Sequence, residues 1–264
     1  MIKDITIGQH FPGNSPLHRM DPRSKLILTL AYIVMIFVSQ NTLSILVSFA
    51  FLLFCYLISR IPLKMLVKSI KPILPIVLFT AILNIFFIDG RVLVQWWIFK
   101  ITEEGVRMAV LLAVRIILLI AGTSLLTYTT SPIALTDGLE RLMSPLKRFH
   151  FPAHELAMMM TIALRFIPTL IEETDKIMSA QKARGADMDS GGLIKRVKSL
   201  IPILIPLFVS AFRRADELAV AMECRCYRGG DGRTRMRQLH FGAVDIWAAI
   251  FMALCIDVYK RQPR

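Results

Sequence analysis

Five long blocks of apolar residues recur along this chain, separated by shorter polar stretches. They cover residues 24–39, 43–58, 72–88, 106–128 and 241–256. A helix that crosses a bilayer needs about 20 mostly apolar residues, with about 17 as the lower limit. The pattern therefore predicts an all-α polytopic membrane protein with about five transmembrane helices.

The polar stretches between the blocks favour one orientation. Residues 60–71 carry four basic residues and no acid, so the positive-inside rule places this loop in the cytoplasm. Residues 89–107 mix acids with few bases and hold the pair Trp96–Trp97, which is typical of the headgroup level on the outer face. Residues 1–25 are basic and have no apolar core, so we expect a cytoplasmic N-terminal segment rather than a cleavable signal peptide.

The domain organisation follows from these blocks. Transmembrane helices 1–4 fall within residues 26–128, a cytoplasmic or interfacial region covers 129–240, and the last transmembrane helix covers 241–256. Residues 257–264 would place three basic side chains on the outer face, against the charge bias, and we interpret them as a non-native tail.

Composition agrees with a bilayer as the solvent. The chain is 55% hydrophobic, and 17 of its 32 basic residues lie between positions 129 and 240. In a water-soluble protein the net charge of +13 would indicate a nucleic-acid partner. Here the basic residues avoid the apolar blocks, which favours a membrane protein without nucleic acid.

Residues 129–240 keep helical periodicity, and we expect helices over 137–149, 154–182 and 193–227. The second is amphipathic with a methionine-rich face, which suits either a packed core element or a docking platform. The third holds an apolar run, 200–212, that contains Pro202 and Pro206 and is too short to cross a bilayer.

A weak internal repeat ends the second and third of these helices. Asp175 precedes Arg184 by nine positions, and Asp216 precedes Arg225 by the same interval. Small residues flank both arginines: Ala183 and Gly185 in the first copy, Cys224 and Cys226 in the second.

Small neighbours leave a guanidinium free to enter a groove and bind a carboxylate through two hydrogen bonds. An arginine in the last turn of a helix also stabilises the helix dipole by about 0.3–1 kcal/mol, which is the simpler interpretation of either one alone. The repetition favours two equivalent docking points on a dimeric or pseudo-dimeric partner.

Arg115 is a charged residue inside the fourth apolar block. Such a charge is a candidate functional site, because an unpaired charge in a bilayer costs several kcal/mol. It fits a binding site for an anionic substrate in a self-contained secondary carrier or channel, or a side chain that snorkels outward or pairs with a carbonyl of a neighbouring helix.

Several short motifs carry a resemblance to a known family. They are GQHFP at 8–12, SPLH at 15–18, DPRSKL at 21–26, ARG at 183–185 and AMECRCYRGG at 221–230. With them the chain resembles, over nearly its whole length, the transmembrane T component of energy-coupling factor (ECF) transporters, the CbiQ/EcfT family of ABC-type uptake systems.

The resemblance implies a scaffold that couples two ABC-type ATPase subunits, EcfA and EcfA′, to a substrate-binding S component for uptake of a vitamin or other micronutrient. It implies that Arg184 and Arg225 are the coupling arginines and that the location is the bacterial cytoplasmic membrane. The second motif departs from the family pattern through its two cysteines. We further expect supporting roles for Asp175, Asp216 and Arg228, and hinges at Pro168, Pro202 or Pro206.

The sequence has neither a G-x-x-x-x-G-K-[ST] phosphate loop nor an H-E-x-x-H zinc motif. We therefore expect a non-catalytic membrane subunit without a cofactor, with ATP hydrolysis in the partner subunits. Cys224, Cys226 and the distant His240 make a poor metal site, because tetrahedral zinc sites usually show two spaced ligand pairs. A membrane enzyme would need convergent carboxylates, histidines or serines, whereas the acids here are spread along helices.

Overall fold

A computed structural model describes residues 10–39, 42–88, 90–96, 99–185, 192–230 and 238–260. These residues form two compact units. The bundle unit comprises the described residues from 10 to 138 together with 238–260, and the arm unit comprises those from 139 to 230. Trp97, the turn at 40–41, positions 8–9 of the first motif and residues 261–264 of the predicted tail lie outside the described residues.

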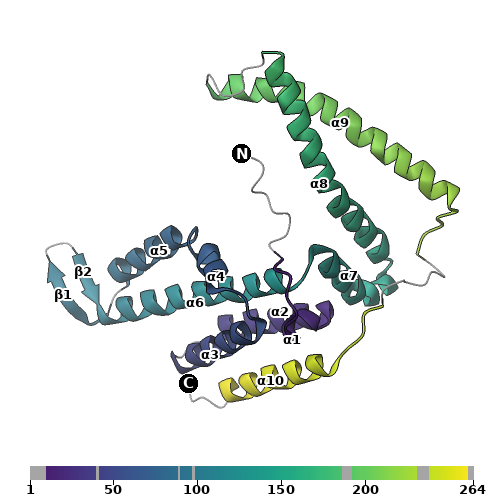
Figure 1. Cartoon of the computed structure of the whole chain (residues 1–264). Helices are drawn as coiled ribbons and strands as arrows, with labels where there is room; N and C mark the ends of the chain where they lie inside the picture. The colour runs from purple at the N-terminus through teal and green to yellow at the C-terminus, as the bar shows by residue number, and fades with distance from the viewer. Residues whose placement is uncertain are drawn as a thin grey trace. The chain divides into compact units, whose positions relative to one another are not determined.

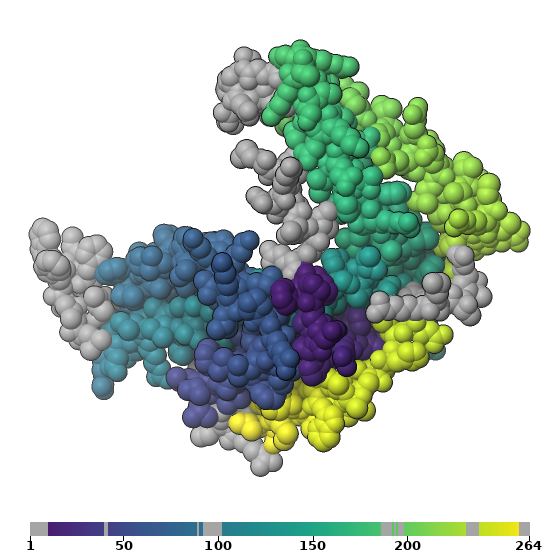
Figure 2. Space-filling view, in the orientation of Figure 1, coloured from purple at the N-terminus to yellow at the C-terminus, as the bar shows by residue number. Residues whose placement is uncertain are grey.

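The bundle unit is built from helices and one short β-hairpin (Figure 1). Its elements are α1 (Pro16–Arg19), α2 (Pro22–Val38), α3 (Thr42–Ser59), α4 (Leu63–Ile70), α5 (Leu74–Phe87), β1 (Val92–Trp96), β2 (Phe99–Thr102), α6 (Glu103–Thr129), the first part of α7 (Pro132–Met143) and α10 (Ala243–Lys260). The atoms of α10 lie directly against those of the N-terminal helices (Figure 2).

Each predicted membrane block coincides with a helix: α2, α3, α5, α6 and α10. Among the described residues, three helices are long and apolar enough to cross a membrane, namely α3, α6 and α8 (Ala153–Ala183), and α4 with α5 makes a fourth if this pair, bent by 57°, is one span. Helix α2 has only 17 residues, and α10 carries Asp245, Asp257 and Lys260. The prediction of an all-α polytopic membrane protein is confirmed, while the number of spans and the cytoplasmic side of α8 stay predictions.

The sequence did not predict the β-hairpin. Strands β1 and β2 pair antiparallel, with Val94 opposite Ile101 and Trp96 opposite Phe99. They fall in the connection between α5 and α6, and Glu103 closes the hairpin by donating its N–H to the Arg91 carbonyl, 2.9 Å away. The apolar residues of this loop therefore form strands, while their role as an aromatic anchor at the membrane surface stays a prediction.

Buried tyrosines tie the bundle helices together. Tyr32 of α2 and Tyr56 of α3 donate their hydroxyls to the carbonyls of Leu118 and Ala121 on α6, at 3.4 and 3.0 Å. Such bonds let a large apolar ring be buried without an unpaired hydroxyl. Gly122 is required beside them, since a Cβ there would lie 2.4 Å from the Tyr32 ring.

His18 holds the N-terminal segment in a folded conformation, and the Phe11 N–H attaches that segment to α6 by donating to the Tyr128 carbonyl at 2.9 Å. The Nε2 of His18 lies 3.0 Å from the Phe11 carbonyl, and its Nδ1 lies 2.7 Å from the Ser15 hydroxyl. Burial lowers the pKa of His18 from its usual 6.5, although the bond to Phe11 opposes this. A neutral ring must donate from Nε2 to the carbonyl, so Nδ1 accepts from Ser15.

The arm unit contains the end of α7, the 3₁₀ helix η1 (Ser144–Phe149), α8 and α9 (Leu193–Cys224). Two of the three helices expected in the region after the fourth span are present as α8 and α9, whereas the expected helix over 137–149 is divided between the end of α7 and the 3₁₀ helix η1. Pro168 lies inside α8, and Pro202 and Pro206 lie inside α9, without ending either helix. Whether they act as hinges stays a prediction.

Candidate functional site

Arg184 occupies the position where α8 ends. It is the C-cap residue, and Gly185 follows in the left-handed region with φ of +82°. The Gly185 N–H donates to the Lys182 carbonyl at 3.0 Å. Glycine adopts this conformation without the penalty of a Cβ, so it stops the helix and leaves Arg184 at its tip.

Arg225 occupies the same position at the end of α9. Cys226 follows with φ of +53°, in place of a glycine. The Cys226 N–H donates to the Glu223 carbonyl and the Tyr227 N–H to the Met222 carbonyl, both at 2.8 Å. This pair of bonds defines a Schellman motif, and the Gly185 bond is its equivalent in the first turn. We call these two ends the arginine turns, 183–185 and 224–226.

Both arginine turns are exposed. Within the described residues, neither the Arg184 nor the Arg225 guanidinium forms an ion pair or a side-chain hydrogen bond. Nine helical residues rise about 13.5 Å, so Asp175 and Asp216 stand too far away along their helices to pair directly with these arginines. Arg228 is also exposed, and the supporting roles of these three residues stay predictions.

Helices α8 and α9 run in opposite directions (Figure 1). Gln181 near the end of α8 donates to the Pro202 carbonyl at 3.2 Å, while His154 at its start lies 3.2 Å from the Tyr227 hydroxyl. At about 1.5 Å per residue, Arg225 lies about 35 Å along α9 from Pro202. The arginine turns therefore stand at opposite ends of the helix pair.

Glu173 of α8 forms polar contacts with α9 between the two ends of the helix pair. Its carboxylate accepts hydrogen bonds from the Ser210 hydroxyl and from the Arg214 guanidinium, the latter at 2.9 Å. The three side chains are partly exposed, so this contact contributes alignment more than stability.

His154 supports the second arginine turn, and the sequence analysis missed it. Its Nδ1 lies 3.0 Å from a Glu140 oxygen on α7, and its Nε2 contacts the Tyr227 hydroxyl. Gly230 packs so closely on the ring that a Cβ there would lie 2.3 Å from it. The signal in the sequence is the run from Tyr227 to Gly230 directly after the arginine, but its partner is 73 residues away.

The cysteines of the second turn carry exposed free thiols. Among the described residues, no group of three or more His, Cys, Asp or Glu side chains is placed to hold a metal ion.

Arg115 contacts the end of a neighbouring helix. Its guanidinium donates to the carbonyl of Ser39, the C-cap of α2, and its buried Nε has no hydrogen-bond partner in the part of the chain that the structure describes. A cation at a helix C-terminus is stabilised by the helix dipole. This geometry favours pairing with a helix carbonyl over a binding site for an anionic substrate.

Comparisons with known proteins agree with the motifs. Residues 13–236 match the family model CbiQ, described as cobalt transport protein. The energy-coupling factor transporter transmembrane protein EcfT of Ruminiclostridium cellulolyticum is 58% identical over 93% of this chain and 92% of its own length. Proteins of the same name from Clostridium kluyveri (99% of this chain, 98% of theirs) and Acidaminococcus fermentans (96% and 94%) are 53% and 51% identical.

Proposed function

This chain belongs to the CbiQ/EcfT family of transmembrane transporter components, and from that premise we propose that its two arginine turns bind two ABC-type ATPase subunits. Through them the chain transmits ATP-driven motion to a substrate-binding S component, for uptake of a vitamin or other micronutrient. It carries no catalytic site of its own, and ATP is hydrolysed in the partner subunits.

The observation that carries this proposal is the equivalence of the two turns. Arg184 and Arg225 are both C-cap residues, both exposed, and both followed by a residue with positive φ. Two equal turns at opposite ends of one helix pair suit a partner with two equal grooves. An exposed guanidinium that has no partner among the described residues can form a charge-assisted bidentate bond in such a groove.

The helix pair supplies the moving element of the mechanism. When ATP draws the two ATPase subunits together, the turns move with them and the crossing of α8 and α9 changes, with Pro168, Pro202 or Pro206 as hinges. The S component packs on exposed apolar side chains of this pair and is reoriented by the change. Exposed apolar side chains on α9 include Ile201, Leu204, Phe208 and Phe212.

The same mechanism requires one orientation of this chain in the cytoplasmic membrane of a bacterium. ATPase subunits work in the cytoplasm, so the arm unit must face it, in agreement with the basic residues of 129–240. The N-terminal segment then lies on the cytoplasmic side as well.

A double charge reversal tests the proposal. Arg184→Glu with Arg225→Glu would place carboxylates where the partner grooves accept guanidinium groups, so the yield of co-purified ATPases should fall about tenfold or more. Arg165→Glu with Arg213→Glu is the matched control, since these exposed arginines lie on the same helices away from their ends. Normal ATPase yield and uptake with the first pair would refute the assignment.

A further inference from the structure

A five-residue segment at the start of α2 forms polar contacts with residues far away in the sequence. We call residues 21–25 the clamp segment. Arg23 binds the Asp21 carboxylate with two nitrogens, at 2.8 and 3.1 Å. Asp21 also caps α2 by accepting the Arg23 N–H at 2.9 Å. Asp21 and Lys25 are buried.

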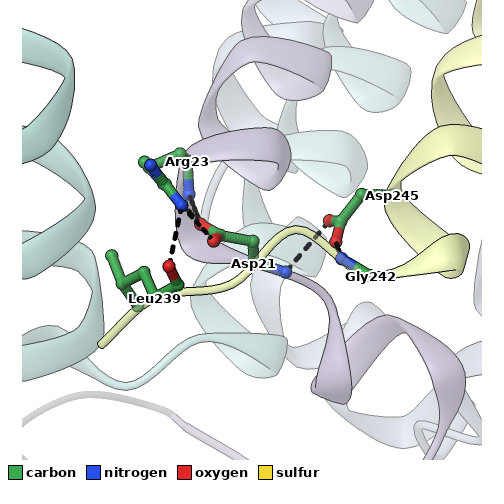
Figure 3. Close-up of polar contacts among 5 residues, drawn as sticks. All are labelled: Asp21, Arg23, Leu239, Gly242 and Asp245. Carbon is green, nitrogen blue, oxygen red and sulfur yellow. Dashed lines mark hydrogen bonds and ion pairs between the residues drawn. The ribbon is translucent and has the colours of Figure 1, made fainter. Parts of the chain in front are cut away.

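The clamp segment holds the chain where it returns to the bundle unit (Figure 3). The Asp21 N–H donates to Asp245 of α10 at 3.0 Å, and the other oxygen of Asp245 accepts the Gly242 N–H at 2.7 Å. Arg23 reaches further along the returning chain, donating to the Leu239 carbonyl at 3.2 Å. Its guanidinium also lies 4.1 Å above the ring of Phe241.

The same segment holds the chain where it departs. Lys25 donates to the carbonyl of Thr129, the last residue of α6, at 2.9 Å. On α7, Gly138 lies so close that a Cβ there would be 3.0 Å from the Pro22 side chain and 3.4 Å from the Arg23 nitrogen. Gly138 is the last residue of the bundle unit before the arm unit begins.

Both stretches of chain that connect the bundle unit to the arm unit therefore contact the clamp segment. The departing chain at 129–138 and the returning chain at 238–245 meet different atoms of the same five residues. Buried charged groups that are paired and hydrogen-bonded resist displacement, because separating them would leave a charge uncompensated. Asp21 with Asp245 balances Arg23 with Lys25, so the cluster has no net charge.

We propose that the clamp segment is the mount through which movement of the arm unit passes into the bundle unit, with Asp21, Arg23 and Asp245 as positioning residues. This inference rests on the proposed function, since it needs an arm unit that moves with ATP. A loose mount would let the arm unit move while the bundle helices stay still. The chain would then still bind its ATPases, but ATP binding would no longer change the conformation of the bundle helices.

The experiment uses the whole complex of this chain, its ATPases and its S component in lipid nanodiscs. Hydrogen exchange of the bundle helices α3 and α6 is compared with MgATP and without nucleotide. The wild-type complex should show a nucleotide-dependent change. Asp245→Asn replaces one of the two carboxylate oxygens that accept hydrogen bonds and keeps the shape of the side chain. Arg23→Gln removes the guanidinium that binds both the Asp21 carboxylate and the Leu239 carbonyl. Both should keep their ATPases and lose most of that change.

Gly138→Leu provides an independent variant, because it wedges the departing chain away from Pro22 and leaves the ion pairs in place. It should lose the signal as well. Arg107→Gln, an exposed arginine at the other end of α6, is the matched control and should keep it.

Two outcomes overturn the inference: a full nucleotide-dependent change in the clamp variants, or no such change in the bundle helices of the wild type. Failure of the proposed function would look different, since the variant with both arginine turns reversed would then retain its ATPases.

Discussion

At the scale of single residues, the two arginine turns differ in the residue that stops the helix. Gly185 and Cys226 both adopt positive φ. A left-handed conformation costs a residue with a Cβ about 1–2 kcal/mol relative to glycine. The second turn therefore holds its arginine with a strained residue, and nothing in the structure explains the choice of cysteine there.

Substitutions at these two positions should act in opposite directions. Cys226→Gly should stabilise the end of α9 by about 1 kcal/mol, and Gly185→Ala should destabilise the end of α8 by a similar amount. The position of the Gly185 Cβ is open, with no described atom within 4 Å, so the cost is one of backbone conformation alone. Amide exchange in the last turn of each helix measures both effects. A slower exchange in Gly185→Ala would contradict the account.

At the scale of elements, α8 and α9 are aligned by a polar contact at their middle. The Glu173–Arg214 pair is 22% and 35% exposed, so we expect a coupling energy of only about 0.5 kcal/mol. A double-mutant cycle with Glu173→Gln and Arg214→Gln measures it by thermal unfolding. The amide oxygen introduced by Glu173→Gln would still accept the Ser210 hydrogen bond. The cycle therefore measures the electrostatic interaction between Glu173 and Arg214 alone. A cycle with Arg213→Gln, a neighbouring exposed arginine, should give no coupling, and equal values in both cycles would contradict the assigned pair.

The long helices were predictable from local patterns, whereas the short helices α1 and α4 were not predicted. Asp21 and Thr102 cap helix starts, and the apolar blocks have the length of spans. The hairpin at 92–102 was missed because its short apolar runs also suit an interfacial loop. The bend between α4 and α5 was missed because the basic residues before Pro72 were assigned to a loop rather than to a helix.

The two arginine turns were predicted from the repeated interval between an aspartate and an arginine, whereas the residues that hold the turns in place were not predicted. The interval from Asp175 to Arg184 recurs in the sequence, but the positive φ of Cys226 has no sequence signal in a residue other than glycine. The partners Asp21 and Asp245 are 224 residues apart. Contacts of this kind are set by packing and not by a local pattern in the sequence. Polar contacts between residues so far apart in the sequence can be recognised only in the folded structure.

At the scale of the whole molecule, the chain divides into the bundle unit and the arm unit, and the proposed function assigns to the arm unit the binding of the ATPase partners. The arginine turns lie in the arm unit and the clamp segment lies in the bundle unit, where we propose that it is the mount. Because different residues carry the two proposed roles, variants of one group should affect ATPase binding and variants of the other should affect transmission alone.

Thiol labelling tests the central claim that the arginine turns bind the ATPases most directly. Cys224 and Cys226 flank Arg225 with exposed thiols, and Ala183→Cys places one beside Arg184. Bound ATPase subunits should slow the reaction of a maleimide at all three positions, while a control thiol at Arg107→Cys should react at the same rate with and without them. Unchanged labelling at both turns in a complex that retains its ATPases would contradict the account.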